Sequence, residues 1–590
     1  MIRNLLGFSR PYWRSFVVGM LLTGFSAVIG LAVPFVVRYY VDRVLPSGDT
    51  RMLGWLLLGL VTVTAANSLS GYVSSIVLVR FSENIIKDIQ VTLFTHIQDL
   101  GMAFHSSART GDLISRVVSD TAQLQMVLGS PALGLISSVI TLAAGAVVMF
   151  LLHWKLALVS LLALPLFTYF AGFFSKRIRR RSRKLQESNA ERMQTLAQAF
   201  YGIREMKTLG VENEFRLRFR SRVADLVRSV VDLVKSISAY KGITGFVGGI
   251  GPVVVLWFGG REVMAGSVSL GTLLAFSAVL VYVFTSARSI IHLYGDVQIA
   301  RASFGRISEI LSLPTETDCC GKVQPVSVKG HVEFHEVAFS YDTGRSVLRG
   351  LSLEIEANEC VAIVGASGAG KTTLVNLLLG FYKPQRGHVY LDGIDVRDLD
   401  RGVLRRFFGV VPQEPFLFPE SIKQNILYGR LDATEEEVVE AARIANIHSF
   451  IAAIPEGYNA RIGEKGLRVS GGEKQRIAIA RAVLRNPRIL IFDEATSEID
   501  QHSEELIRDA LGEIVKNRTT IIITHRPSML ALASRIAVLD NGEIVACGTH
   551  NELSDCCPAY ANLLAHGAEV QVGPKREHSL SSFRRGQGEE

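Results

Sequence analysis

The chain has 590 residues, enough for about three or four domains, and 48% of them are hydrophobic whereas only 20% are charged, against roughly 25% in typical soluble domains. Long uncharged runs lie within residues 1–295, which excludes a wholly soluble protein. The net charge of +8 is typical of proteins that bind nucleic acid or membranes, but much of it lies in one cluster beside an uncharged run, without interleaved aromatic residues. We therefore predict a membrane protein that binds no nucleic acid.

Six segments lack any charge for about 19 residues or more, the length that spans a bilayer as a helix. They are residues 17–37, 53–79, 121–152, 156–175, 242–260 and 263–287. The third is longer than one span, so we expect its first residues to lie in water. No Asp, Glu, Lys, Arg or His lies within these runs, which argues against a proton-coupled carrier and suits a hydrophobic or amphiphilic cargo.

The connections between the runs predict the orientation in the membrane. Residues 80–120 and 176–241 are long and helix-compatible, so we expect the spanning helices to continue beyond the membrane. The second connection begins with Lys176-Arg-Ile-Arg-Arg-Arg-Ser-Arg-Lys184, which the positive-inside rule places in the cytoplasm together with both termini. The short connections, including 261–262, then face outward.

Each long connection is interrupted by glycines near its middle. We predict that residues 104–113 in the first and 203–209 in the second form short helices that dock on another domain. A change of composition over residues 296–330, which include Pro314 and Pro325, predicts a linker.

The predicted organisation is a transmembrane domain at 1–295, a linker at 296–330, a soluble α/β domain at 331–566 and a polar tail at 567–590. All six cysteines lie in the C-terminal half, outside the predicted membrane domain. This distribution suggests reduced thiols in a cytosolic compartment.

Residues 365–372, Gly-Ala-Ser-Gly-Ala-Gly-Lys-Thr, match the phosphate-loop pattern G-x-x-x-x-G-K-S/T at every fixed position. An apolar strand-like run precedes them and a helix-like run, starting at Thr373, follows. The glycines let successive N–H groups point at one phosphate, and the helix N-terminus adds its positive end. We predict that Lys371 reaches the β- and γ-phosphates of a nucleotide and that the Thr372 hydroxyl binds Mg²⁺.

Two more strand-like runs end in polar residues that complete such a site. The apolar run 488–492 ends in Asp493, predicted to hold the Mg²⁺ shell, and Glu494, predicted to polarise the attacking water as general base. The β-branched run 520–524 delivers His525 to the same edge of the sheet, where a histidine can contact the γ-phosphate.

Two further stretches suit an ATP ligand. Tyr341 ends an alternating strand at 331–341 and offers an aromatic face on which adenine can stack. Ser470 and two glycines precede a predicted helix at 473–484, which gives a second anion site at a helix N-terminus. If both helix ends bind one γ-phosphate, they need not come from the same chain.

Together these motifs resemble those of the ATP-binding cassette (ABC) family. Residues 365–372 are similar to the Walker A motif and 489–494 to the Walker B motif. The segment Ser470-Gly-Gly-Glu473 resembles the family signature, with Glu473 where Gln is common and Val469 where Leu is common.

The resemblance extends beyond these motifs to nearly the whole chain. It assigns Gln413 to the Q-loop, which senses Mg²⁺ and the membrane domain, and Asp500 to the D-loop, where Ser-Glu-Ile-Asp replaces the usual Ser-Ala-Leu-Asp. Residues 463–466 resemble a loop typical of exporters, and residues 104–120 the first inner loop of this class.

The resemblance implies a half-transporter of the type IV exporter fold: six transmembrane helices with long cytoplasmic extensions, followed by an α/β P-loop nucleotide-binding domain. The expected function is ATP-driven export of a drug, lipid or peptide by a homodimer, in a multi-pass protein of the inner (plasma) membrane. Alternatives are an importer on the same fold, for example of a metal chelate, a heterodimeric half-transporter, or a non-transporting nucleotidase, which Glu494 and His525 disfavour.

The predicted ligands are ATP and Mg²⁺, and the predicted site divides by role. Catalysis is assigned to Glu494 and His525, and Mg²⁺ binding to Thr372, Gln413 and Asp493. ATP binding is assigned to Tyr341, Gly365, Ser367, Gly368, Gly370, Lys371, Thr372, Thr373, Gln413, Ser470, Gly471, Gly472, Glu473 and Asp500.

Overall fold

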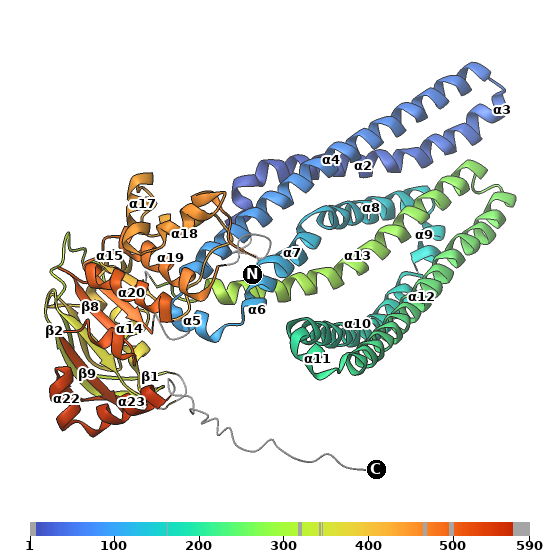
Figure 1. Cartoon of the computed structure of the whole chain (residues 1–590). Coiled ribbons are helices and arrows are strands. Elements are labelled where there is room, and N and C mark those ends of the chain that lie inside the picture. Colours follow the sequence, from blue (N-terminus) through green and yellow to red (C-terminus); the bar gives the residue numbers. More distant parts are fainter. Residues whose placement is uncertain are drawn as a thin grey trace, which may run out of the picture. The chain divides into compact units, whose positions relative to one another are not determined.

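The computed structural model describes residues 7–161, 163–316, 321–341, 344, 346–463, 469–494 and 501–569. They form two compact units (Figure 1). The first comprises the chain up to Gln98 and Arg109–Leu313, and the second comprises Asp99–Ala108 and the chain from Pro314 onward. A short segment that the sequence assigned to the membrane domain therefore belongs to the second unit.

Among the described residues of the first unit, all regular secondary structure is helical. Its elements are η1 (Arg10–Tyr12), α2 (Trp13–Tyr39), η2 (Tyr40–Val44), α3 (Leu45–Ser47), α4 (Thr50–Gln98), α6 (Thr110–Ser115), η3 (Arg116–Asp120), α7 (Thr121–Leu128), α8 (Ser130–Leu152), α9 (Trp154–Leu161), α10 (Ala163–Tyr201), α11 (Ile203–Leu209), α12 (Glu212–Met264) and α13 (Leu270–Leu311). Of these, η2 and η3 are π-helical and interrupt longer helical stretches.

Five helical segments among the described residues are long and apolar enough to cross a membrane. They are Gly7–Ser47, Thr50–Gln98, Gly134–Leu152, Glu212–Met264 and Leu270–Ile290. Each contains or overlaps one of the predicted uncharged runs. The remaining run, 156–175, passes over residue 162, which lies outside the described residues, so the count of six spans stays a prediction.

The connection before α13 lies later than predicted. We placed it at 261–262, but α12 continues to Met264, and the chain turns over the next five residues. Gly266 adopts the left-handed conformation there (φ +71°), and the Ser269 hydroxyl caps α13 by accepting a hydrogen bond from the Thr272 N–H. Charged residues do not end a helix, whereas a left-handed glycine followed by a serine cap does.

The stretch assigned to a linker, 296–330, is also partly helical. Helix α13 runs through its first half to Leu311. Pro314 is the first proline after α13 begins, and the described residues between it and β1 contain no helix.

The longest helices extend well beyond a bilayer, as predicted. Helix α4 has 49 residues and α12 has 53, so each is roughly 75 Å long at 1.5 Å per residue, against a hydrocarbon core of about 30 Å. Helices α10 and α12 run side by side, with α11 at their turn (Figure 1). Gly202 and Gly210 flank α11, which spans the predicted 203–209.

The other predicted docking helix is wrong in detail, because residues 104–113 do not form one helix. They are divided between α5 (Met102–Ser107) and α6, which are separated by extended Ala108 and Arg109. The Ser107 hydroxyl donates to the carbonyls of residues 103 and 104, which favours an end to α5 at this point.

The second unit is an α/β domain built on two sheets. A six-stranded sheet has the order β10-β9-β3-β8-β7-β6, with β10 alone antiparallel to its neighbour, and a four-stranded antiparallel sheet has the order β2-β1-β4-β5. The strands are β1 (Val332–Ser340), β2 (Ser346–Ile355), β3 (Cys360–Val364), β4 (Arg386–Leu391), β5 (Ile394–Asp395), β6 (Phe408–Val411), β7 (Ile489–Asp493), β8 (Thr519–Ile523), β9 (Arg535–Asp540) and β10 (Glu543–Gly548).

Helices cover both faces of the larger sheet. Besides α5, the helices of the second unit are α14 (Lys371–Leu378), η5 (Val396–Asp398), α15 (Arg401–Arg406), α16 (Ile422–Leu427), α17 (Glu435–Ile444), α18 (His448–Ala453), η6 (Gly457–Asn459), α19 (Gly471–Leu484), α20 (Gln501–Ile514), α21 (Pro527–Leu530), α22 (His550–Cys556) and α23 (Pro558–Glu569). One core joins α14 to both sheets, and another packs α16, α17, α19 and α20 on the larger sheet.

Sheet topology fixes where the functional residues can meet. Strands β3, β8, β7 and β6 are parallel neighbours, so their carboxyl ends share one edge. The phosphate loop follows β3, His525 follows β8 closely, and Asp493 ends β7. Ligands of open parallel sheets bind at this edge.

Candidate nucleotide site

The loop between β3 and α14 depends on glycine. Gly368 and Gly370 have φ angles of +81° and +109°, and a Cβ added at Gly370 would lie 2.8 Å from the Leu348 side chain. Helix α14 starts directly after Gly370. Because Ser367 and Gly368 are exposed, the loop offers its backbone N–H groups and a helix N-terminus to an anionic ligand.

The Lys371 side chain is buried beneath this loop. Its ammonium donates to the carbonyls of Gly365, at 2.7 Å, and Ala366, at 3.2 Å, and lies 3.6 Å from a carboxylate oxygen of Glu494. The loop and the end of β7 are thus joined through one cation.

The predicted metal ligands Thr372 and Asp493 lie together. The Thr372 hydroxyl is 3.1 Å from Asp493 Oδ2, and these oxygens are the ligands that Mg²⁺ prefers. Burial raises the pKa of Asp493, and the neighbouring Glu494 charge adds to that rise, whereas the Thr372 hydrogen bond and Lys371 oppose it. A cation at this position would compensate the buried carboxylate, so the donor set fits Mg²⁺.

Glu494 occupies a backbone conformation that is uncommon for a residue with a side chain (φ +48°). Its N–H donates to the Ile523 carbonyl at 2.9 Å, which ties the end of β7 to β8. Its Oε1 atom lies 3.6 Å from both Lys371 Nζ and His525 Nε2. Strained backbone positions of this kind cluster at functional sites, and here the strain aims a carboxylate at the phosphate loop.

Tyr341 reaches the first turn of α14. Its hydroxyl lies 3.2 Å from the Thr373 hydroxyl, and its ring packs edge-on against Phe339 and Tyr382, at centroid distances of 4.9 and 5.2 Å. Tyr382 was missed from the sequence, where a tyrosine after a helix carries no signal of its own.

Ser470 begins α19 with a capping box. Its hydroxyl accepts from the Glu473 N–H at 3.3 Å, and the Glu473 carboxylate accepts from the Ser470 N–H at 2.7 Å. Glu and Gln both serve at this position of a capping box, which gives Glu473 a structural role in place of the more common Gln. A Cβ at Gly472 would lie 2.5 Å from Ser503 Oγ, so this glycine lets α19 approach α20.

One chain brings together only part of the predicted site. Among the described residues, no hydrogen bond or ion pair joins the segment Ser470–Glu473 to the phosphate loop, nor Gln413 to Thr372 or Asp493. Gln413 lies exposed just after β6, beside β7 in the sheet. Asp500 and residues 464–466 lie outside the described residues.

Comparisons with known proteins agree with this geometry. The family model described as "ABC transporter transmembrane region" matches residues 16–287, and the model "ABC transporter" matches residues 348–497. The chain is 32% identical to the Bacillus subtilis "Putative multidrug export ATP-binding/permease protein YgaD" over 95% of this chain and 98% of that protein. It is 33% identical to the ATP-dependent lipid A-core flippase of Syntrophus aciditrophicus, over 94% and 92%.

A solved structure has the same fold over nearly its whole length. It is a bacterial Atm1-family ABC exporter with ATP bound. The TM-score is 0.83 at 28% identity, and the alignment covers 94% of this chain and 98% of that one.

Proposed function

Because this chain belongs to the ABC transporter family and is an ATPase coupled to membrane transport, we propose that it works as a homodimer that exports a hydrophobic or amphiphilic compound from the cytoplasm. The observation that carries this proposal is the convergence of Lys371, Glu494 and His525 at one sheet edge, beside the Thr372–Asp493 pair. These groups together suit ATP hydrolysis, whereas a protein that only bound a nucleotide for regulation would not need them.

Each residue has a distinct role in the proposed hydrolysis. Lys371 and the loop N–H groups hold the β- and γ-phosphates, and Tyr341 stacks on the adenine. Glu494 takes a proton from the attacking water, and His525 orients the γ-phosphate from the adjacent strand end. Thr372, Asp493 and Gln413 would hold Mg²⁺, which neutralises charge on the phosphates when bound.

The second half of each site is supplied by another chain in this proposal. The exposed residues Ser470 and Gly471 stand at the N-terminus of α19, where an anion is favoured, and they make no hydrogen bond to their own phosphate loop among the described residues. A γ-phosphate held by Lys371 of one protomer and by Ser470 of its partner bridges the two chains. Hydrolysis removes the bridge and favours separation, which gives a two-state switch.

The proposed cargo, orientation and location rest on the membrane half. Relatives are named for multidrug export and lipid A-core flipping, and the predicted spans are uncharged, which supports a drug or lipid cargo. The cluster of basic residues at the start of residues 176–184 supports a cytoplasmic position for the helical extensions and the nucleotide site. We assign the protein to the inner (plasma) membrane.

The direct test is ATP turnover by this chain alone in lipid nanodiscs. Glu494→Gln should retain ATP binding and lose about 10²-fold or more in turnover, the contribution of a general base. Glu513→Gln is the matched control, because Glu513 is exposed on α20 and pairs only with Lys516 among the described residues. Undiminished turnover of Glu494→Gln would refute the proposed base.

The same preparation tests the homodimer and the cargo. Turnover by the wild-type chain without a second polypeptide is expected, and a well-folded sample that binds ATP without hydrolysing it would instead require a different partner chain. A compound that raises wild-type turnover, but not that of Glu494→Gln, identifies the cargo class. Lys371→Ala should weaken ATP binding itself, since this cation lies under the phosphate loop.

A further inference from the structure

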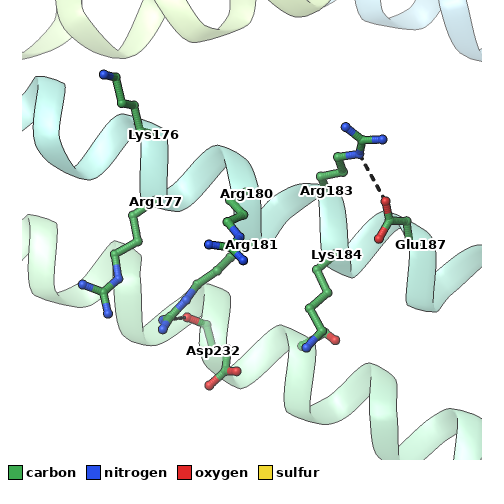
Figure 2. Close-up of a pocket in the computed structure, with 9 residues that line it drawn as sticks. Lys176, Arg177, Arg180, Arg181, Arg183, Lys184, Glu187 and Asp232 are labelled. Atoms are coloured by element: carbon green, nitrogen blue, oxygen red, sulfur yellow. Dashed lines mark hydrogen bonds and ion pairs between the residues drawn. The ribbon is translucent and has the colours of Figure 1, made fainter.

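A basic cavity of about 930 Å³ lies between α10 and α12, entirely within the first unit. It is lined by Lys176, Arg177, Arg180, Arg181, Arg183, Lys184, Glu187, Ser229 and Asp232. Figure 2 shows Arg177, Arg181 and Lys184 reaching from α10 toward the helix that carries Asp232. The cavity belongs neither to the nucleotide site nor to the apolar spans.

The charges around this cavity are not balanced. Six lining side chains are cationic and two are anionic. Arg183 pairs with Glu187 at 3.1 Å, and Asp232 lies 4.0 Å from Lys235, which is outside the lining. Each anionic side chain thus has a cation of its own within 4.0 Å, and the lining keeps an excess of positive charge.

Four of the cations form no ion pair in the part of the chain that the structure describes: Lys176, Arg177, Arg180 and Lys184. Arg181 instead joins α10 to α12, because its guanidinium donates to the Asp232 carbonyl and to Ser236 Oγ, the latter at 2.6 Å. Like charges gathered on one wall repel one another unless an anion joins them.

The cavity lies at the boundary of the apolar segments. The uncharged run 156–175 ends directly before Lys176, and α12 becomes uncharged after Lys241. Phe174 and Tyr240 pack against each other there, with ring centroids 6.0 Å apart, which aligns the two helices at this level. The cations thus begin where a spanning helix meets the headgroups of the adjoining leaflet.

The positive-inside rule explains basic residues on this side of a membrane, but it does not require them to line a cavity between two helices. We propose that this cavity binds the phosphate-bearing headgroup of an anionic lipid from the adjoining leaflet. Arginine forks and lysine ammonium groups match phosphate oxygens, and basic pockets between transmembrane helices suit such headgroups. Under the orientation proposed above, this is the cytoplasmic leaflet, although binding itself does not depend on ATP.

The test is lipid binding to the full-length protein, measured by native mass spectrometry in detergent with phosphatidic acid as the probe and without ATP. Removing one cation near a lipid phosphate should weaken binding about fivefold, so Arg177→Gln/Arg180→Gln/Lys184→Gln should weaken it on the order of 100-fold. Arg216→Gln/Arg218→Gln/Arg220→Gln is the matched control, because these exposed α12 arginines lie outside the cavity. Equal loss in both triple variants, or no loss in either, would overturn the proposal.

A second variant and a competition experiment complete the test. Asp232→Asn removes an anion from the lining, so it should tighten binding of phosphatidic acid about fivefold even if the triple variant folds poorly. Weaker or unchanged binding in that variant would contradict the proposed site. Millimolar inorganic phosphate should not displace the lipid; displacement at that concentration would show that the cavity takes a soluble phosphate instead.

Discussion

The ion pair between Asp120 and Arg306 joins the π-helical turn η3 to α13 across 186 residues of sequence. Arg306 donates to the Asp120 carboxylate through Nε, at 2.8 Å, and through Nη2, and Nη2 also donates to Ser303 Oγ at 3.1 Å. The Asp120 side chain is 5% exposed, whereas that of Arg306 is 46% exposed. When the pair is broken, Arg306 can therefore regain hydration, whereas the Asp120 side chain stays buried.

Asp120→Asn keeps the shape of the side chain and removes its charge. Breaking a fully buried pair costs about 3–5 kcal/mol, but the half-exposed Arg306 can return to water, which limits the loss. Charge-assisted hydrogen bonds contribute about 1.5–3 kcal/mol, so we expect the free energy of unfolding of the first unit to fall by about 2 kcal/mol.

Tryptophan fluorescence during SDS titration from mild detergent isolates this unit, because all four tryptophans lie in it: Trp13, Trp55, Trp154 and Trp257. A double-mutant cycle with Arg306→Gln measures the pair itself. We expect a coupling energy of about 1–2 kcal/mol, whereas strictly additive single effects would refute the reasoning.

Three further predictions concern the nucleotide unit. Tyr341→Ala should raise the KM for ATP about fivefold or more in a turnover assay, because base stacking contributes about 1–3 kcal/mol, whereas Tyr341→Trp should keep it near wild type. Gly472→Ala should lower turnover and thermal stability, since its Cβ would lie 2.5 Å from Ser503 Oγ, and Ser503→Gly should restore both. The raised pKa of Asp493 favours its protonated form, so binding of Mg²⁺ with a fluorescent ATP analogue should weaken as pH falls through that pKa. In Glu494→Gln the weakening should occur at lower pH, because the neighbouring charge is gone; an unchanged pH profile would contradict this coupling.

Local patterns predicted the nucleotide unit well because its motifs combine a short strand, a turn and a helix. Strand β3 ends at Val364 and α14 begins at Lys371, where the phosphate-loop pattern requires them. The runs that end in Asp493 and before His525 are β7 and β8, and their parallel pairing brings the side chains to one edge. Such predictions succeed because each depends on neighbouring residues and on the geometry of parallel strands.

Features that depend on distant contacts were not predictable. The Arg261–Glu262 pair looked like a connection because charges usually flank spans, yet the turn depends on the conformation of Gly266. The role of Tyr382 depends on its contact with the ring of Tyr341, which is distant in the sequence. The spacing Ser470-x-x-Glu473 is that of a capping box, a signal that the prediction of an ATP contact for Glu473 did not use.

The place of Asp99–Ala108 in the second unit also depends on contacts between residues that are distant in the sequence. The Glu316 N–H donates to the Asp99 carbonyl at 2.7 Å, and the Glu316 carboxylate pairs with Arg405. At the other end of the segment, the hydroxyls of Tyr382 and Ser106 are 3.2 Å apart. The segment Asp99–Ala108, which follows α4 and contains α5, is therefore held to the rest of the second unit near both of its ends.

This attachment connects α5, through Tyr382, to Tyr341, the residue that we propose stacks on adenine. The Tyr382 ring packs on Tyr341, which in turn contacts α14 through Thr373. A base that stacks on Tyr341 would therefore bind one side-chain contact away from Tyr382, whose hydroxyl donates to Ser106. Because packed aromatic side chains have few alternative arrangements, we expect ATP binding at the proposed adenine position to affect the position of α5 within this unit, which exchange of the α5 amide hydrogens with and without ATP would measure.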